Sequence, residues 1–364
     1  MRPIIILTMI VKDEAHCIER AIRSALPHVD HWVIVDTGST DGTQGLILEL
    51  LNGVPGALFQ SDWKDFGTNR TELAEKTKKY AERVGISGRA LSLLLDADDE
   101  IVSFPTCSGL NKFNDAFEAE VSFGPMSYPQ IRLIWSDLPW RWEGVTHERI
   151  CLTARDATTK KLEGFRYRTG VDSARRKSGR KTKEDIELLE KSLADNPDNP
   201  REVFYLANCY RDDGQFGRAA DVYAQRLTMR GFDEELYVSA VRASECLEKT
   251  GDTDGAYLAG LGAINLRPWR AEAYLQLAGL ARRQGAYGLA HSFAKQIQGL
   301  PEKTDDRLFV DVSARGWRGV EEYVYGCSYI GDWAEQTRCL NWLVEEVPDH
   351  FDQIVNNCNK ITAR

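Results

Sequence analysis

The amino-acid sequence predicts an α/β domain followed by an all-α domain. Short apolar runs typical of buried parallel strands, each ending in polar turn residues, fill the first third of the chain. From residue 200 onward, helical patterns alternate with short Gly, Asp and Pro turns. A dense basic run, SARRKSGRKTK, separates the two parts at residues 173–183. We therefore expect an α/β domain over residues 1–170, a basic linker with a connecting helix over 171–199, and helical repeats over 200–364.

Composition and charge restrict the class of protein. Of the 364 residues, 43% are hydrophobic and 28% are charged, which is typical of a soluble globular protein. The net charge of −9 provides no general attraction to nucleic acid or anionic membranes. The eight cysteines show no paired spacing, so we expect reduced thiols and a cytoplasmic location. The opening run IIILTMIV is too short for a membrane anchor, and we expect no membrane association.

The α/β prediction begins with two apolar runs, the first followed by KDE and the second by DTGSTDGT. In a right-handed β-α-β unit these two strand ends lie side by side. Asp36 and the three residues after it are suited to bind ribose and base hydroxyls, and a simple helix-capping loop is the alternative. The elements expected, in chain order, are a strand over Ile4–Val11, a helix over residues 15–26 closed by Pro27, a strand over 32–35 and a helix over 44–51.

A third buried strand, over residues 91–95, ends in a group of acids. The stretch LSLLLDADDE delivers Asp96, Asp98, Asp99 and Glu100 at the strand's carboxyl end, where open α/β sheets bind ligands. So many negative charges repel one another unless a cation joins them. Carboxylate oxygens suit Mg²⁺ or Mn²⁺, and these ions usually hold substrate phosphates as well. An acidic, solvated turn is the alternative.

The motifs occur in an order that points to one family. The sequence TMIVKDE, then VDTGSTDGT, then DFGTNR at residues 65–70 and finally DADDE resembles the family 2 glycosyltransferases of the GT-A fold. The resemblance covers roughly the first 170 residues, and the order is more specific than any single motif. It implies a Rossmann-like nucleotide-sugar-binding domain, a donor that is usually UDP-linked, Mn²⁺ or Mg²⁺ as cofactor, and sugar transfer with inversion.

The resemblance also implies roles for individual residues. Asp13 and Glu14 match the acidic turn that faces uracil and ribose. Arg70 matches the basic residue that faces the donor or its pyrophosphate, and Asp98 matches the better candidate for direct metal ligation in the D-x-D pair. The metal would offset charge on the leaving nucleoside diphosphate. The nucleotide-sugar-binding candidates are Asp13, Glu14, Asp36, Thr37, Gly38, Ser39, Arg70 and Asp96, and the metal candidates are Asp98, Asp96 and His147.

An inverting transferase also needs a base that deprotonates the acceptor, and a carboxylate is the usual choice. Related sequences often carry a His-Glu pair after an arginine-bearing strand. Glu148 is therefore the candidate catalytic base, and His147 is a candidate metal or phosphate contact. A structural histidine at a surface strand end is the alternative. Glu143 and Asp172 are rivals for the base.

Further elements are expected between and after these motifs. A helix is expected from residue 70 to about residue 84, with Asn69 as its N-cap, and strands are expected around residues 131–135 and over Arg149–Leu152. Three tryptophans, at positions 135, 140 and 142, either stack on a sugar or acceptor or close the core. The basic run at 173–183 is either a flap that closes over the diphosphate, a contact to a polyanionic acceptor, or a plain linker. Glu184 and Asp185 are expected as first-turn charges of a helix.

The second half of the chain contains a repeated layout. Gly214, Gly251 and Gly285 are spaced 37 and 34 residues apart, each between stretches rich in alanine, leucine and tyrosine. This layout resembles tetratricopeptide (TPR) repeats, whose period is 34 residues. Such repeats bury a shared core by stacking, and they would serve here as a scaffold for an acceptor, a protein partner or a second copy of the chain.

Three functions remain open from the sequence. The favoured one is a sugar transferase whose acceptor is a peptide, a protein or a glycan. A transferase acting on modified bases of nucleic acid is an alternative, supported by the local basic run alone. The third is a nucleotide-sugar-binding or scaffold protein without turnover.

Overall fold

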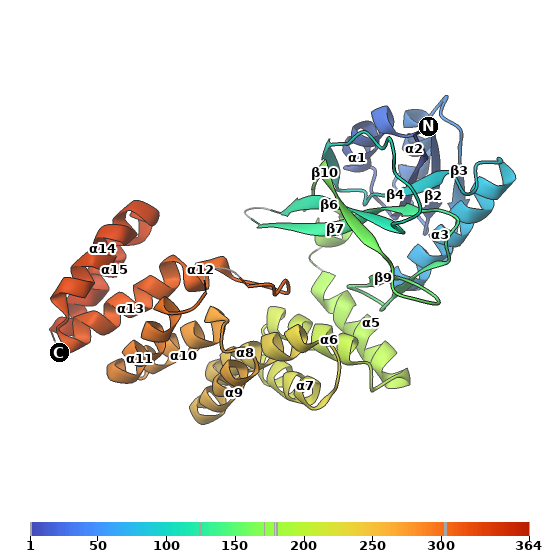
Figure 1. Ribbon diagram of the computed structural model, residues 1–364. Coiled ribbons are helices and arrows are strands. Elements are labelled where there is room, and N and C mark those ends of the chain that lie inside the picture. Colours follow the sequence, from blue (N-terminus) through green and yellow to red (C-terminus); the bar gives the residue numbers. More distant parts are fainter. Residues whose placement is uncertain are drawn as a thin grey trace. The chain divides into compact units, whose positions relative to one another are not determined.

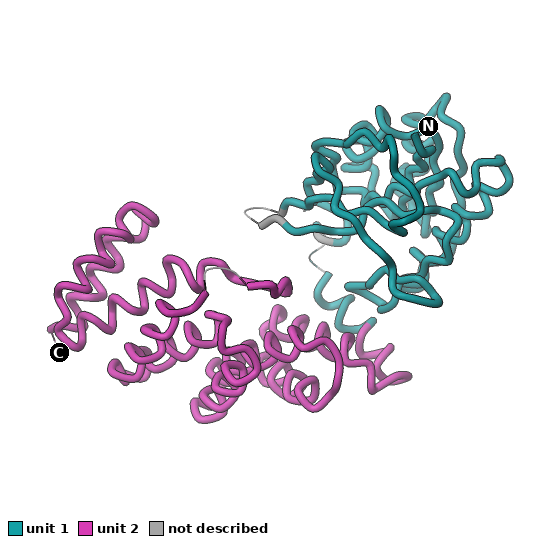
Figure 2. Tube along the Cα trace, in the orientation of Figure 1, with its two compact units in different colours: residues 1–188 teal, residues 189–364 magenta. Residues whose placement is uncertain are grey.

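The computed structural model describes residues 2–123, 126–170, 172–177, 179, 181–301 and 304–363. The chain divides into two compact units, residues 1–188 (unit 1) and 189–364 (unit 2), coloured separately in Figure 2. Unit 1 is a mixed α/β sheet with helices, and unit 2 is helical (Figure 1). The predicted fold class, an α/β part followed by helical repeats, is confirmed. The boundary falls within helix α5 (Lys181–Asp195).

Unit 1 is built around an eight-stranded sheet with the strand order β3-β2-β1-β4-β7-β6-β10-β5. A separate two-stranded hairpin, β8-β9, stands beside it. The elements, in chain order, are β1 (Ile4–Val11), α1 (Ile18–Ala25), the 3₁₀ turn η1 (Leu26–His28), β2 (His31–Asp36), α2 (Thr43–Leu50), β3 (Gly56–Gln60), α3 (Phe66–Arg83), β4 (Ala90–Leu94), β5 (Glu100–Ser103), β6 (Ala116–Phe123), β7 (Met126–Trp135), β8 (Trp140–Glu143), β9 (Arg149–Leu152), β10 (Thr159–Arg168) and α4 (Ala174–Lys177).

Parallel pairing explains both the apolar strands and the position of the acidic loops. Strand β1 pairs in parallel with β2 on one side and with β4 on the other. Helices α1 and α2 pack on one face of these strands and α3 packs on the other, so side chains on both faces are buried. The carboxyl ends of the three strands therefore meet at one edge of the sheet, and KDE, DTGSTDGT and DADDE leave from that edge.

Helix α3 begins earlier than the sequence predicts. Its first residue is Phe66 and its N-cap is Asp65, whose carboxylate accepts the backbone N–H of Thr68. Asn69, the predicted cap, lies inside the helix and is fully buried. Its amide group donates to the carbonyl of Asp62 and accepts the N–H of Lys64, so it fixes the loop before the helix instead. Both residues are good caps by type, and the hydrogen bonds of Asn69 to the preceding loop account for the four-residue shift.

Other predicted boundaries differ by small amounts. Helix α1 starts at Ile18 rather than at residue 15, and Pro27 lies inside the 3₁₀ turn η1 that follows it. Glu184 lies in the first turn of α5, as predicted. Asp185 lies beyond that turn, where it is buried and accepts hydrogen bonds from Thr146 and Arg175. Trp135 and Trp140 are buried in the core and Trp142 is half-buried against it. All eight cysteines are free thiols, as predicted.

Unit 2 is a succession of antiparallel helix pairs. The glycines that define the sequence period, Gly214, Gly251 and Gly285, each adopt a left-handed φ in the turn between two helices of a pair. Gly331 does the same in a fourth pair. The helices are α6 (Pro200–Asp212), α7 (Phe216–Thr228), α8 (Asp233–Thr250), α9 (Thr253–Leu266), α10 (Ala271–Arg283), α11 (Tyr287–Gln298), α12 (Val312–Arg315), α13 (Trp317–Ile330), α14 (Trp333–Glu346) and α15 (Pro348–Thr362).

A long insertion interrupts the repeat between the third and fourth pairs. It runs from the end of α11 to the start of α13 and includes the short helix α12. The 34-residue period gave no indication of this insertion. Within the described residues, no helix is both long enough and apolar enough to cross a membrane.

Close backbone contact between α3 and the β8-β9 hairpin generates a prediction. A Cβ atom on Gly67 would lie 2.3 Å from the carbonyl oxygen of Gly144. Gly67→Ala should therefore lower the free energy of unfolding by about 1–3 kcal/mol, the usual cost of overpacking. Gly45, inside α2, has no atom within 4 Å of such a Cβ, so Gly45→Ala should be neutral or stabilise by up to about 1 kcal/mol. Urea unfolding of both variants tests this, and an equal effect of the two would contradict the contact.

Candidate functional site

The loops after β1 and β2 are joined by side-chain hydrogen bonds. The backbone N–H of Asp13 donates to the hydroxyl of Ser39, and the carboxylate of Asp13 accepts the N–H of Thr40. Asp13 has a left-handed φ of 56°, which is uncommon outside glycine. The N–H of Glu14 donates to the Thr43 hydroxyl. The two predicted nucleoside-binding loops therefore form one structure.

Asp36 organises the second of these loops. Its side chain is buried and accepts the N–H groups of Gly38 and Ser39 and the side-chain amide of Gln44. Thr37 is tied back to the carbonyl of Val11 through its own N–H and hydroxyl. Gly38 has a φ of 104°, which a residue with a side chain rarely adopts. The sequence DTGS thus holds a tight turn at the end of β2.

Arg70 lies at the centre of the acidic edge. Its Nε donates to Glu148 Oε1 at 2.6 Å and its Nη2 donates to Asp96 Oδ1 at 2.6 Å. The arginine side chain is 16% exposed and that of Glu148 is 15% exposed, so the interaction is largely shielded from solvent. One guanidinium group therefore joins the predicted base, on the segment between β8 and β9, to the first aspartate of the D-x-D pair.

Arg132 is a second arginine at this acidic edge, and the sequence did not single it out. It projects from β7 and is buried, with its Nη2 2.9 Å from Asp99 Oδ2 and its Nη1 3.8 Å from Asp96 Oδ2. Burial disfavours ionisation of Asp96, yet Arg70 and Arg132 hold its pKa below the ordinary value. Burial raises the pKa of Asp99 to about 6. A charged residue within the apolar run QIRLIW was the signal in the sequence.

The start of the basic run lies directly over Asp98 and Glu14. The backbone N–H of Ser173 donates to Asp98 Oδ2 at 3.2 Å, and that of Ala174 donates to Glu14 Oε2 at 3.1 Å. Arg20 donates to both carboxylate oxygens of Asp172 and to the carbonyl of Asp98. Burial raises the pKa of Glu14. Residues 172–174 therefore cover two of the predicted ligand-binding acids, while positions 171, 178 and 180 of the predicted linker lie outside the described residues.

The carboxylate oxygens at this edge are of the kind that binds divalent cations. Asp98 is 8% exposed, and within the described residues Asp99 Oδ1 is a buried carboxylate oxygen without a hydrogen bond. Buried oxygens of this kind are ligands that Mg²⁺ and Mn²⁺ prefer. His147 lies on the exposed loop before β9 with a φ of 51°, and in the described chain Asp96, Asp98 and His147 do not place three ligand atoms within 4.8 Å of one another. The assignment of His147 to the metal stays a prediction.

The two rival bases, Glu143 and Asp172, are each held by arginines. Glu143 forms ion pairs with Arg141 and Arg149, and the hydrogen bond from Arg149 lowers the pKa of Glu143. The hydrogen bonds from Arg20 lower the pKa of Asp172. A lowered pKa makes a carboxylate a weaker base, and all three base candidates are held by an arginine.

Comparison with known proteins adds information on the chain as a whole. No family model matches it. It is 28% identical over 324 residues to a TPR repeat-containing protein of Synechococcus elongatus, an alignment that spans 80% of this chain and 74% of that protein. MamA is similar to 52% of this chain over 95% of its own length, with 15% identity and a TM-score of 0.38. YrrB, described as a TPR protein with an unusual peptide-binding site, is similar over 50% of this chain and 86% of its own, with 14% identity and a TM-score of 0.38.

The bridge from Arg70 to Glu148 generates a prediction about stability. Arg70→Met leaves the shielded carboxylate of Glu148 without its cation and removes one of the two arginines at Asp96, so it should lower the free energy of unfolding by about 3 kcal/mol. Adding Glu148→Gln removes one of those charges, so the two changes should show a coupling energy of about 1–3 kcal/mol in a double-mutant cycle.

The matched control is the pair of Arg23 and Glu19 on the surface of α1. These side chains form a similar ion pair but are 63% and 52% exposed, so their coupling should stay below about 0.5 kcal/mol. Urea unfolding at pH 7 measures both cycles. A coupling for Arg70 and Glu148 no larger than that of the control would show that the buried bridge does not form in solution.

Proposed function

We propose that unit 1 is a metal-dependent, inverting glycosyltransferase. It moves a sugar from a nucleotide-sugar donor, with UDP as the nucleoside diphosphate, to a hydroxyl or similar nucleophile of an acceptor. The supporting observation is that three acidic segments gather at one sheet edge: residues 13–14 after β1, Asp36 at the end of β2 and residues 96–99 after β4. This edge is where open α/β sheets bind their ligands.

In this proposal, different residues at the edge bind different parts of the nucleotide-sugar donor. Asp13, Glu14 and Asp36 recognise the nucleoside, with hydroxyls and amides of the DTGS turn beside them. Arg70 faces the diphosphate, because a guanidinium fork matches phosphate oxygens well. Asp98 and Asp96 hold Mn²⁺ or Mg²⁺ together with phosphate oxygens, and the metal stabilises the nucleoside diphosphate as it leaves.

The hydrogen bond between Arg70 and Glu148 also indicates how donor binding could free the base. While Arg70 donates to Glu148, Oε1 of that carboxylate is engaged in this hydrogen bond. A bound diphosphate competes for the same guanidinium through charge-assisted hydrogen bonds. Donor binding would then release Glu148, which accepts the proton of the acceptor nucleophile as it attacks the anomeric carbon.

The same ion pair favours a second candidate function, a nucleotide-sugar-binding protein without turnover. If Arg70 stays on Glu148 when the donor is bound, the chain has a donor site but no free base. Incubation with UDP-sugars and Mn²⁺, followed by measurement of UDP release, separates the two functions. Unit 2 would supply the acceptor contact in the first case, with a peptide, protein or glycan acceptor favoured over modified nucleic acid.

Changing the D-x-D pair tests the metal assignment. Asp98→Asn keeps the shape of the side chain and its contact with Ser173 but removes a charge from the proposed ligand. It should abolish UDP release while the far-UV circular dichroism spectrum stays that of the wild type. Asp137→Asn, which removes a carboxylate paired with Lys112 away from this edge, should leave UDP release unchanged. Full activity of Asp98→Asn would rule out this residue as a metal ligand.

Changing Glu148 tests the base. Glu148→Gln should lower the rate of transfer by about two to four orders of magnitude, the usual contribution of general base catalysis. Affinity for UDP and metal should stay the same or rise, because the change weakens the group that competes with the diphosphate for Arg70. Glu143→Gln is the matched control on the neighbouring strand β8 and should retain its rate. If Glu148→Gln is as fast as the wild type and Glu143→Gln is slow, the role belongs to Glu143.

A further inference from the structure

The segment that carries Glu148 makes a tight turn between β8 and β9. Gly144 has a φ of 103° and His147 has a φ of 51°. A Cβ atom on Gly144 would lie 3.3 Å from the carbonyl oxygen of Thr146 and 3.6 Å from Cα of Glu148, so the backbone turns sharply over residues 144–148. A left-handed φ is unfavourable for a residue with a side chain, and it persists where the surrounding structure fixes it. The contacts on either side of His147 therefore have to supply that constraint.

Hydrogen bonds hold the chain on both sides of His147. After it, the side chain of Glu148 accepts the hydrogen bond from Arg70. Before it, the hydroxyl of Thr146 donates to Asp185 Oδ1 at 2.8 Å, and Thr146 is buried. In the proposed mechanism the diphosphate takes Arg70 away from Glu148. The hydrogen bond between Thr146 and Asp185 does not involve Arg70, so it continues to hold the backbone of this segment at that moment.

Asp185 is a buried carboxylate with partners at both of its oxygens. Its side chain is 1% exposed. Besides the hydroxyl of Thr146, Oδ1 accepts a hydrogen bond from Arg175 at 2.7 Å, and Oδ2 accepts one from Lys181 at 3.1 Å. Burial disfavours ionisation of Asp185, yet Lys181 and Arg175 hold its pKa below the ordinary value. Thr146 therefore donates to an ionised carboxylate, and such a hydrogen bond is stronger than one between neutral groups.

The same carboxylate holds the start of the basic run. Arg175, which donates to Asp185, directly follows Ala174, whose backbone N–H donates to Glu14. The guanidinium of Arg175 also lies over the ring of Phe66 at the start of α3, with 5.0 Å between Cζ and the ring centroid. Asp185 therefore joins three parts of unit 1, which are the segment of the proposed base, the start of the basic run and helix α5.

We propose that Asp185 is a positioning residue for the base. Through the hydroxyl of Thr146 it holds the turn at His147 that directs Glu148 to the acceptor. A general base has to stay within hydrogen-bond reach of the proton that it accepts, and a displacement of about 1 Å can lower the rate by about 100-fold. This inference rests on the proposed function, because Asp185 acts in it through Glu148.

Two changes at Thr146 test the hydrogen bond without altering any charge. Valine has nearly the size of threonine but cannot donate to Asp185, whereas serine can. Thr146→Val should lower kcat for UDP release by about tenfold or more, because the base is no longer held in place. The KM for the donor should rise by no more than about twofold, since the donor contacts remain. Thr146→Ser should keep kcat within about threefold of the wild type, because it restores the hydroxyl donor.

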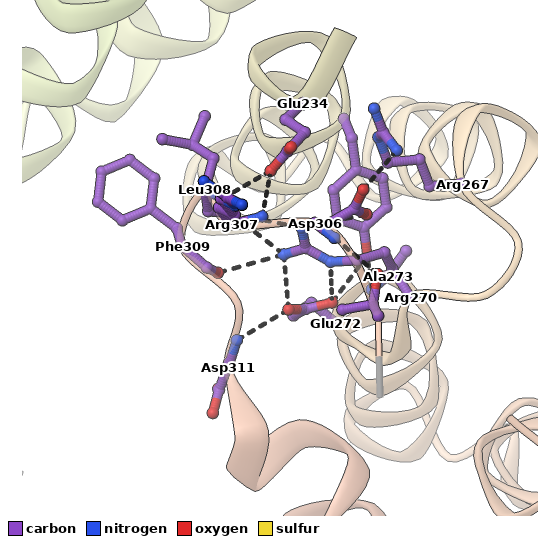
Figure 3. A network of polar contacts seen from close by, with 12 residues as sticks. Glu234, Arg267, Arg270, Glu272, Ala273, Asp306, Arg307, Leu308, Phe309 and Asp311 are labelled. Carbon is purple, nitrogen blue, oxygen red and sulfur yellow. Dashed lines mark hydrogen bonds and ion pairs between the residues drawn. The ribbon is translucent and has the colours of Figure 1, made fainter. Parts of the chain in front are cut away.

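Asp185→Asn should lower kcat in the same way, and Asp306 in unit 2 provides its matched control. Asp306 lies in a network of the same kind (Figure 3). Its side chain is 9% exposed, accepts hydrogen bonds from Arg267 and Trp269 and lies 3.6 Å from Arg270. Asp306→Asn and Asp185→Asn both deprive shielded cations of a counter-charge, so both should lower the urea midpoint. Asp306→Asn should nevertheless leave kcat unchanged.

Hydrogen–deuterium exchange of the backbone amides of residues 145–148 provides a measurement that does not need turnover. Exchange should be faster in Thr146→Val and Asp185→Asn than in the wild type, and unchanged in Thr146→Ser and Asp306→Asn. If Thr146→Val and Asp185→Asn keep the wild-type kcat, or if Thr146→Ser loses as much as Thr146→Val, the positioning role is overturned while the proposed function stands. If the wild type releases no UDP, the proposed function fails, and unchanged exchange in the two variants would show separately that Asp185 does not hold this segment.

Discussion

The structure of unit 1 depends on how it holds many carboxylates at one edge of a sheet. Residues 96–99 alone supply three, and the loops after β1 and β2 supply more. Two arginines from different elements make this arrangement possible: Arg70 at the start of α3 and Arg132 on β7. Each bridges two acids, and each is shielded from water. The remaining surplus of negative charge suits a site that takes a metal ion and a diphosphate together, because the ion compensates both.

The fold was predictable where periodicity and burial agree. Strands β1, β2 and β4 are buried on both faces, so continuous apolar runs indicated them, and the acidic turns after them indicated the acidic edge of the sheet. The start of α3 was not predictable in this way. Asp65 and Asn69 are both good caps, and the choice between them depended on hydrogen bonds from Asn69 to Asp62 and Lys64, which are tertiary contacts of a loop.

The sequence was enough to identify most residues of the candidate site, but not the contacts between them. The acids and Arg70 were found from motifs, and the structure brings Arg70, Asp96 and Glu148 together. The contact between Glu148 and Arg70 could not be expected from the sequence, because the two residues are 78 positions apart and no motif links them. The insertion between α11 and α13 in unit 2 was not predicted either, since a repeat period describes what recurs and not what interrupts it.

The central claim is that unit 1 binds a nucleoside diphosphate through a divalent cation at the acidic edge. Titration calorimetry of UDP against the full-length chain, with Mn²⁺ and then with an excess of chelator, tests it most directly. The account predicts clear binding with Mn²⁺ and a loss of about tenfold or more in affinity with chelator, because the carboxylates at residues 96–99 would repel the diphosphate without the ion. Equal affinity under both conditions, or no binding under either, would contradict it.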